Sequence, residues 1–444
     1  MGWGKIPALA LVEVYRYLEP PDRLQASATC KHWRQTLFHP RFFDRATFVV
    51  NRRNEARNAF YLQNLAHFIS ATSIIFDSSS AHAVQRAAEI LLAICSVNER
   101  LVSLSLRPTQ SQFALPRQFT TENFLHSGLI EPIKSLLGRR SPAIRHLNLG
   151  SCERLSMYCP EFLRALACPQ ELRLLAMASV KENPSFYYVG NLEASLFDKC
   201  SNLRLLSIDY DFLSDELLRV LQLLHLERIV LHIHAFDKTQ SGSSDDAWRS
   251  FQDHSPQTEL RINLIKASEA VKYLHSHILH ESMPLSHMKV LFCKHMNPQA
   301  VDFISQNYNG SFKSLTWIDS SYDIQEAEFY FRTDQDPLVM MAWRCRKLEE
   351  IVVHGYLLDV HNLVGIARLR GKDLKRFEVA KFDLLPNPLL VSFLNEINRL
   401  MVGEWHPKKD KELPAALSSC SYPSECARDK YIMELTQKDI ADFN

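Results

Sequence analysis

One apolar pattern recurs along most of the chain. It consists of an apolar residue, two others, a second apolar residue, one other and a third apolar residue, in some copies loosened by a position. The triads that follow it are Ala71-Ile74-Phe76, Leu101-Leu104-Leu106, Ile144-Leu147-Leu149, Leu172-Leu175-Met177, Leu203-Leu206-Ile208, Leu226-Ile229-Leu231, Leu260-Ile262-Leu264, Met288-Leu291-Cys293, Phe312-Leu315-Trp317, Leu348-Ile351-Val353 and Leu374-Phe377-Val379. Because alternate residues of a strand point to the same face, each triad predicts a short strand with one buried face.

Segments with helical spacing of apolar residues separate these triads. Examples cover residues 83–92, 217–224 and 270–279. A strand and a returning helix in each unit are typical of a leucine-rich repeat, so the pattern predicts an α/β fold, an irregular leucine-rich-repeat solenoid shaped as a horseshoe. A doubly wound sheet also alternates strand and helix. No predicted strand is followed by a Gly-rich phosphate loop, and the chain has only 12 Gly, so the solenoid is favoured.

The first forty residues carry a different, purely helical pattern. Leu11, Val14, Tyr15 and Leu18 recur at helical spacing after Pro7, and a Pro pair at 20–21 ends that run. A second helix is expected to begin at Asp22 as its N-cap, and a third is expected around Trp33, Leu37 and Phe38. Three helices in so short a segment bury little core by themselves. We therefore expect them to expose apolar surface for a partner.

The order of landmarks in this segment resembles the F-box. The family pattern of Leu-Pro, an apolar run ending in Tyr-Leu, Asp-Leu and Val-Cys-x-x-Trp falls on Ile6-Pro7, Val14-Tyr15-Arg16-Tyr17-Leu18, Asp22-Arg23 and Thr29-Cys30-Lys31-His32-Trp33. The departures are Leu9 in place of an acidic residue, Ala10 in place of a larger aliphatic one, Arg23 in place of Leu and Thr29 in place of Val. The chain is similar in particular to F-box proteins with degenerate leucine-rich repeats.

The resemblance implies a non-catalytic substrate receptor. An F-box docks on a Skp-type adaptor and, through it, on a cullin-RING ubiquitin ligase, while the repeat array holds a protein substrate. The residues that the resemblance assigns to adaptor binding are Pro7, Leu11, Val14, Tyr15, Leu18, Leu24 and Trp33. The substrate-binding residues stay unknown. Positions between the apolar repeat residues, such as Arg145, His146, Asn148, Arg204 and Arg228, are candidates that are equally consistent with solvated strand residues.

Two rival interpretations come from other classes of protein. The amino-terminal helices could simply cap a leucine-rich-repeat scaffold that has no adaptor affinity. The chain could instead bind nucleic acid through basic pairs such as Arg52-Arg53 or Arg139-Arg140, but 51 Lys+Arg balance 50 Asp+Glu and give a net charge of +1. This balance disfavours nucleic acid as a partner.

Composition restricts the compartment and the redox state. Residues 1–6 lack the apolar core of a secretory signal, and no run of about 18 apolar residues predicts a membrane span. The ten Cys are scattered without C-x-x-C pairs, which indicates reduced thiols. We expect a protein of the cytoplasm, the nucleus or both, without a membrane partner.

No catalytic motif is present, and we expect no catalytic residue, no metal and no cofactor. His275, His277 and His280 lie on a probable helix and His232 and His234 on a probable strand, but no supporting carboxylate or Cys pair keeps zinc-ligand spacing. A Cys that accepts ubiquitin as a thioester would need an activating base, which the sequence does not indicate. Ser243 and Ser244 in the polar loop 238–246 are either phosphoacceptors or plain loop residues, and the plain loop is favoured.

These patterns divide the chain into three parts. Residues 1–45 form the F-box, and residues 46–406 form the repeat array, which ends in a capping helix. The side chains expected in that cap are Phe393, Ile397, Leu400, Met401 and Trp405. Residues 407–444 are expected to be a flexible carboxyl-terminal tail.

Overall fold

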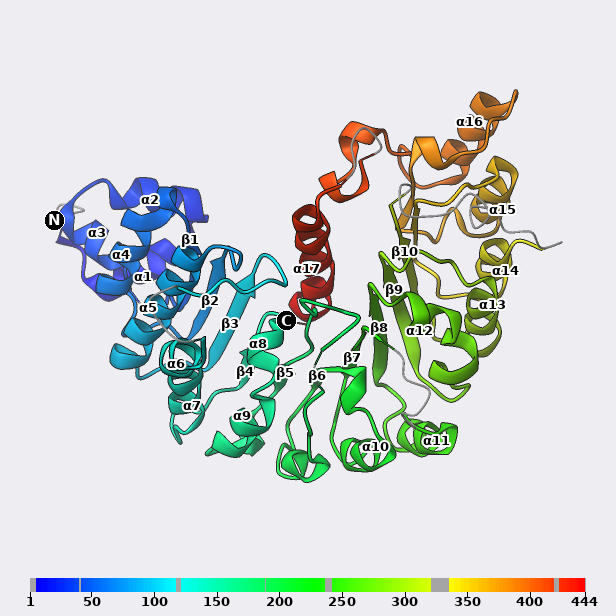
Figure 1. The fold of residues 1–444 in the computed structure, drawn as a ribbon. Helices are drawn as coiled ribbons and strands as arrows, with labels where there is room; N and C mark the ends of the chain where they lie inside the picture. Colours follow the sequence, from blue (N-terminus) through cyan, green and yellow to red (C-terminus); the bar gives the residue numbers. More distant parts are fainter. Residues whose placement is uncertain are drawn as a thin grey trace.

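A computed structural model describes residues 5–39, 41–116, 121–187, 189–235, 242–320, 335–418 and 423–443. Its centre is a sheet of twelve parallel strands in which each strand pairs with the next one along the chain (Figure 1). The strands are β1 (Arg45–Val50), β2 (Ala71–Phe76), β3 (Ser103–Pro108), β4 (His146–Asn148), β5 (Leu174–Ala176), β6 (Leu205–Asp209), β7 (Arg228–Ile233), β8 (Glu259–Ile265), β9 (Leu285–Leu291), β10 (Ser314–Ile318), β11 (Glu350–His354) and β12 (Arg376–Val379).

Helices connect successive strands on the convex side of this curved sheet, as Figure 1 shows. The α-helices are α1 (Ala8–Arg16), α2 (Pro20–Ser27), α3 (Lys31–Leu37), α4 (Glu55–Asn64), α5 (Ala81–Val97), α6 (Thr121–Leu125), α7 (Glu131–Leu137), α8 (Glu153–Ser156), α9 (Cys159–Ala165), α10 (Asp215–Leu221), α11 (Asp245–His254), α12 (Ser268–Lys272), α13 (Pro298–Asn307), α14 (Pro337–Arg344), α15 (Val360–Arg370), α16 (Leu390–Leu400) and α17 (Glu425–Ala441). Short turns are 3-10 helical at Arg52–Asn54, Pro169–Glu171, Ala194–Phe197, Tyr210–Phe212, Lys381–Asp383, Asp410–Glu412 and Ala415–Leu417, and π-helical at His126–Ile130 and Leu274–Ile278. The predicted leucine-rich-repeat-like horseshoe is confirmed.

The strand register explains why the apolar triads recur. The middle residue of one triad pairs directly with the middle residue of the next, as in Leu104 with Leu147 and Leu147 with Leu175. These side chains are buried in one continuous core between the sheet and the helices. Because every unit contributes to the same apolar row, neighbouring units stabilise one another.

All eleven predicted triads coincide with a strand, with one error of phase. Leu285, Met288 and Val290 face the helix-side core in β9, whereas Leu291 lies in a separate cluster on the concave side. The predicted triad Met288-Leu291-Cys293 is therefore out of phase with the true triad Leu285-Met288-Val290. The sequence does not reveal this error, because the strand is apolar on both faces. The pattern also missed β1, whose buried residues are Ala46 and Phe48.

The predicted capping helix is present as α16, and the residues after it complete the cap. Ile397 is buried, and Trp405 stacks on Phe377 with ring centroids 5.6 Å apart while its Nε1 donates to the Phe377 carbonyl oxygen at 2.7 Å. This indole covers the apolar end of the last strand.

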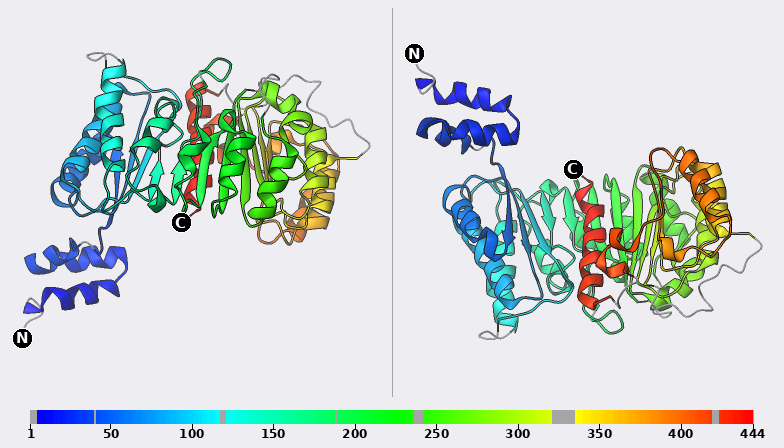
Figure 2. Two further views of the ribbon diagram at one scale, coloured as in Figure 1. Left: turned by 90° about the horizontal axis from the view of Figure 1, so that it is seen from below. Right: turned by 90° about the horizontal axis from the view of Figure 1, so that it is seen from above.

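The expectation of a flexible tail is wrong for the end of the chain. Residues 425–441 form α17, which runs through the hollow of the horseshoe (Figures 1 and 2). Its buried residues include Arg428, Asp429 and Asp439. Charged residues suggest a solvated segment, but in the fold Asp429 and Asp439 meet Lys266, Arg261 and Lys289, and Arg428 lies over the Phe292 ring.

None of the described helices is both long and apolar enough to cross a membrane.

Candidate interaction surface on the amino-terminal helices

Helices α1, α2 and α3 form a small module that projects from the first strand of the array (Figure 2). Pro7 precedes α1, and its carbonyl oxygen accepts from the Leu11 amide at 3.0 Å. Helix α2 begins at the Pro pair, where a missing N–H costs nothing. Its N-cap is Glu19 and not the predicted Asp22. Asp22 lies in the first turn, where its negative charge interacts favourably with the positive end of the helix dipole.

Tyr15 is the centre of the small core inside this module. Its hydroxyl donates to the Trp33 carbonyl oxygen at 3.0 Å, and its ring meets the rings of Trp33 and Phe42 edge-on, with centroids 5.8 and 5.9 Å away. Leu11 and Val12 are buried on the same side of α1. These contacts fix α1 against α3.

Arg23, which departs from the F-box pattern, has a clear structural role. Its Nε donates to the carbonyl oxygens of Tyr15 and Leu18 at 2.9 and 2.7 Å, which closes the carboxyl end of α1. Its guanidinium also lies over the Phe42 ring, 5.2 Å from the centroid. The last carbonyls of a helix need such donors, so Arg23 replaces the packing of a Leu with charge-assisted hydrogen bonds.

The outer side of the module exposes large apolar side chains beside the ion pair of Glu13 and Arg16. Leu9, Tyr17 and Leu24 are 77%, 85% and 61% exposed, and Val14 is also exposed. At about 100° per residue, Leu9, Val14 and Tyr17 fall on the side of α1 opposite its buried residues. We call Leu9, Val14, Tyr17 and Leu24 the outer apolar surface.

The structure divides the seven predicted adaptor-binding residues. Pro7, Val14 and Leu24 are exposed, and Leu18 and Trp33 are partly buried. Leu11 and Tyr15 are fully buried inside the module, so they support the surface instead of forming it. The prediction omitted Leu9 and Tyr17, although the helical angle between these residues and the buried ones was readable from the sequence.

The module is tied to the array through aromatic rings. The Phe38 ring lies 5.4 Å from that of Phe60 in α4 and 5.8 Å from that of Phe43. Phe38 therefore links the module to the first helix of the array.

Among the described residues, Asp209, His232 and His234 form a group that could hold a metal ion. One ligand atom from each lies within 4.8 Å of the others, and all three residues are buried. However, Ser179 lies among them: its carbonyl oxygen hydrogen-bonds to both imidazoles, at 2.8 and 2.9 Å, and its amide donates to Asp209 at 2.7 Å. The Lys181 ammonium also holds the Asp209 carboxylate at 2.7 Å. A metal ion would have to displace this cation, so we assign the cluster to the folding of the loop after β5.

Most of the described thiols are poor nucleophiles because they are buried. Burial raises the pKa of Cys152 and Cys345 to about 12 and that of Cys200 to about 11. A thiol with such a pKa carries almost no thiolate at neutral pH. Cys30, in the amino-terminal module, is partly buried and precedes α3 as its N-cap.

The two candidate phosphoacceptors have structural roles. Ser243 is buried and its Oγ accepts from Trp248 Nε1 at 2.8 Å, while Ser244 caps α11. Residues 236–241 of the same loop lie outside the described part of the chain. The geometry of Ser243 favours a structural role over modification.

The candidate substrate positions also differ in their surroundings. Arg145 and Arg204 are exposed and pair with Glu171 and Glu227, respectively. Arg228 is buried beneath α17. His146 and Asn148 lie in β4 and line a cavity of about 200 Å³ beside the end of α17.

Comparison with known proteins places this geometry in context. Residues 3–48 match the F-box-like family. The chain is 26% identical to F-box only protein 33 of Homo sapiens over 86% of this chain and 77% of the relative. It is 22% identical to F-box/LRR-repeat protein 21 of Mus musculus over 87% of this chain and 85% of the relative. A solved structure described as Rad7 and Elc1 complex in yeast overlaps with a TM-score of 0.41 and 16% identity, covering 87% of this chain and 91% of that chain. The resemblance read from the sequence is confirmed.

Proposed function

Because the amino-terminal module belongs to the F-box-like family, we propose that this chain is the substrate-recognition subunit of a Skp-cullin-F-box ubiquitin ligase. The observation that carries the proposal is the outer apolar surface, where Leu9, Tyr17 and Leu24 remain exposed on the F-box-like helices. Several large exposed apolar side chains on the helices of one small module favour a protein-docking surface. The partner would be a Skp-type adaptor, and through it a cullin-RING ligase.

In this proposal the chain recruits its target and other subunits supply the chemistry. The array would hold a protein substrate while the F-box fixes it near the conjugating enzyme. Tethering raises the effective concentration of a target lysine near the thioester, which accelerates transfer without a catalytic side chain in the receptor. The high pKa of the buried thiols agrees with this division of labour. A receptor of this kind acts in the cytoplasm or the nucleus.

We propose a corresponding division of the chain. Residues 1–45 would be the adaptor-docking unit, and residues 46–406 the recognition array with its cap. The remaining residues, which include α17, belong functionally with the array because they fill its hollow.

The rival proposal, in which the helices only cap a scaffold, fits the surface less well. A cap buries its apolar side chains against the open end of a repeat array. Here the array contacts the module through Phe38, while Leu9 and Tyr17 point away from the buried side of α1.

Co-purification with the adaptor tests the proposal. Tyr17→Asp together with Leu24→Asp should abolish retention of the adaptor, because a docked interface would bury both carboxylates without partners. Leu223→Asp is the matched control, since Leu223 is 74% exposed on the array. Equal retention by the double variant and the control would refute the adaptor-binding role. Leu18→Asp with Trp33→Ala would be a less suitable pair, because both residues are partly buried and their loss would also disturb the module.

A further inference from the structure

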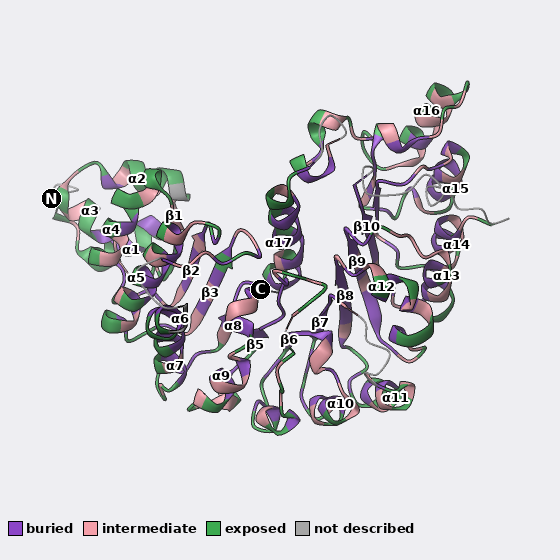
Figure 3. Cartoon of the chain, in the orientation of Figure 1, coloured by how far each residue is buried: buried purple, intermediate pink, exposed green. Residues whose placement is uncertain are grey.

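Helix α17 covers one part of the concave face and leaves another part open. In β2 and β3 buried and more exposed residues alternate, as expected of strands with one covered face. In β6, β7 and β10 every residue is buried, so both faces are covered (Figure 3). The helix that covers the second face is the chain's own carboxyl-terminal segment.

The apolar contacts of α17 are separate from the core of the array. Ile432, Met433 and Leu435 pack with concave-face residues in one cluster, and Ile440 packs in another. The concave-face partners in these clusters include Ile265, Leu291, Ile318, Val352, Leu205 and Val230. The large core between sheet and outer helices contains no residue of α17. The array therefore has a complete core without this helix.

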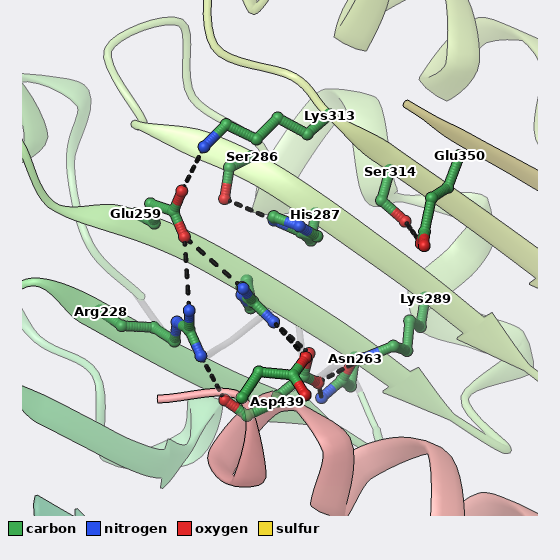
Figure 4. A network of polar contacts seen from close by, with 12 residues as sticks. Arg228, Glu259, Asn263, Ser286, His287, Lys289, Lys313, Ser314, Glu350 and Asp439 are labelled. Atoms are coloured by element: carbon green, nitrogen blue, oxygen red, sulfur yellow. Dashed lines mark hydrogen bonds and ion pairs between the residues drawn. The ribbon is translucent and has the colours of Figure 1, made fainter. Parts of the chain in front are cut away.

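Charge fixes the carboxyl-terminal half of α17 on the sheet. The Asp439 carboxylate accepts from Arg261 at 3.0 Å and from Asn263 at 2.9 Å, and it also accepts from the Lys289 ammonium. Arg228 donates to the Asp439 carbonyl oxygen at 2.7 Å (Figure 4). Burial alone would raise the pKa of Asp439, but Lys289 and Arg261 outweigh it and hold this pKa well below its ordinary value. Asp439 is therefore a buried anion in a cationic site.

A second acidic contact lies ten residues earlier on the same helix. Lys266 pairs with Asp429 at 2.6 Å and also with Glu425. Ser111, from the loop after β3, donates to the other oxygen of the Asp429 carboxylate. Ten helical residues span about 15 Å, so the concave face receives two carboxylates at a fixed separation with an apolar stripe between them.

The concave face would be strongly cationic without α17. Among the described residues, Arg228, Arg261 and Lys313 pair with Glu259, and Glu350 lies near Lys289, so four cations would then face two carboxylates. In addition, the Nε atoms of Arg228 and Arg261 are buried without an acceptor among the described residues. The site therefore has donor capacity that Asp439 does not fill, and it selects for an acidic occupant.

We propose that the concave face of β7–β10 is the target-recognition surface of this receptor, and that α17 occupies it in the manner of a bound target. The cognate partner is an amphipathic helix of another protein that carries acidic side chains beside an apolar stripe and takes the place of α17. This inference rests on the proposed receptor function and names the chemistry of its substrate. A tethered helix competes at a high effective concentration, so such a partner binds in proportion to the fraction of molecules in which α17 is released.

A labelled synthetic peptide of residues 423–444 tests the exchange on the full-length chain. The chain with Asp439→Asn should bind this peptide at least about tenfold more tightly than the wild-type chain, because its own helix is held less firmly. Asp429→Asn is a second release variant at the other acidic contact, and it serves if the first does not fold. Hydrogen exchange of the strands shows in each case that the array is intact.

Two controls test the chemistry of recognition. A scrambled peptide of equal composition should not bind, and Lys289→Glu in the Asp439→Asn chain should lower the affinity for the original peptide by at least about tenfold. Equal binding of the peptide by wild-type and both release variants, or equal binding of the scrambled peptide, would overturn the inference. Adaptor co-purification of the same variants separates the two proposals. If the variants retain the adaptor but do not bind the peptide, only the present inference is refuted. If they bind the peptide but do not retain the adaptor, only the proposed receptor function is refuted.

Discussion

The two ends of the chain form helices of opposite kinds. The amino-terminal helices face solvent with Leu9, Tyr17 and Leu24, although apolar side chains gain by leaving water. The carboxyl-terminal helix α17 instead buries Asp429 and Asp439, although charges lose hydration on burial. Each arrangement is unfavourable for an isolated helix. In the proposed function a partner outside the chain covers the first, whereas the second is stabilised by cations that the chain itself supplies.

The comparison extends to how firmly each end is held. The module contacts the array through a few rings around Phe38, whereas α17 meets strands across the hollow with apolar clusters and ion pairs. Under the proposed functions, the surface that accepts an adaptor stays open, while the surface that selects a target is occupied by α17 until a competitor with the same chemistry displaces it.

The largest expected effect is at the cationic site under α17. Lys289→Glu places a carboxylate against Asp439 inside the fold and should lower stability by about 3–5 kcal/mol, because it breaks a buried ion pair. Lys375→Glu is the matched control, since Lys375 is 71% exposed in its pair with Glu349, and it should cost less than about 1 kcal/mol. Denaturant unfolding measures both, and equal losses would show that α17 is not held by charge.

Two core leucines should report on the independence of α17. Leu206→Ala and Leu435→Ala each remove a buried side chain and should each cost about 2–5 kcal/mol. The two variants should differ in which segments lose protection from hydrogen exchange. Leu435→Ala should accelerate exchange in α17 alone, and Leu206→Ala should accelerate it across the sheet. Faster exchange throughout the sheet in Leu435→Ala would mean that α17 is part of the array core.

Arg23 should matter more to the amino-terminal module than other arginines there. Arg23→Ala removes the donors that close α1 and should destabilise the module by about 1.5–3 kcal/mol. Arg34→Ala, at an exposed position of α3, serves as the control and should have little effect. Hydrogen exchange of α1 measures the difference, and the same rate in both variants would remove the capping role.

The smallest expected effect concerns pH and contrasts two buried aspartates. Asp439 lies among cations, whereas the Asp383 carboxylate accepts from the neutral Gly355 amide at 2.8 Å, and burial raises the pKa of Asp383 to about 7. This folded pKa exceeds the ordinary value of about 3.9, so the contribution of Asp383 is fully favourable below about pH 4 and is lost as pH rises to about 7. The low pKa of Asp439 gives no change in that window. Burial lowers the pKa of His234 and His287 to about 3, and these residues act in the opposite direction over this window, so Asp383 is tested by comparing two chains. The Tm of Asp383→Asn relative to the wild-type chain should rise by a few degrees from pH 4 to pH 7, which changes the slope of Tm against pH. An identical slope in the variant would exclude Asp383 as its source.

Much of the array was predictable because its information is local. Each triad specifies a strand by itself, and its repetition specifies how the strands stack, as the aligned Leu104, Leu147 and Leu175 show. The first strand was not predicted, because its buried residues Ala46 and Phe48 do not form a full triad. The phase error at Leu291 arose because this strand is apolar on both faces, so alternation no longer marks the side that faces the helices.

The surface of the amino-terminal helices was predictable only in part. The spacing of apolar residues predicted the three helices and an exposed apolar surface. It did not predict which of these residues are buried in the core of the module. Tyr15 and Leu11 are buried because α3 lies against that side of α1, and this packing is set by Trp33, eighteen residues beyond Tyr15.

The sequence by itself determined the two kinds of unit, their order and the family of the first, because helical spacing, strand alternation and the F-box landmarks are properties of short segments. Only the tertiary structure decided that the last helix lies in the hollow of the horseshoe. Its charged residues suggest a solvated tail until Arg228, Arg261 and Lys289 are brought to Asp439 from positions at least 150 residues away. Ion pairs between residues so far apart in the sequence produce no periodic pattern from which they could be predicted.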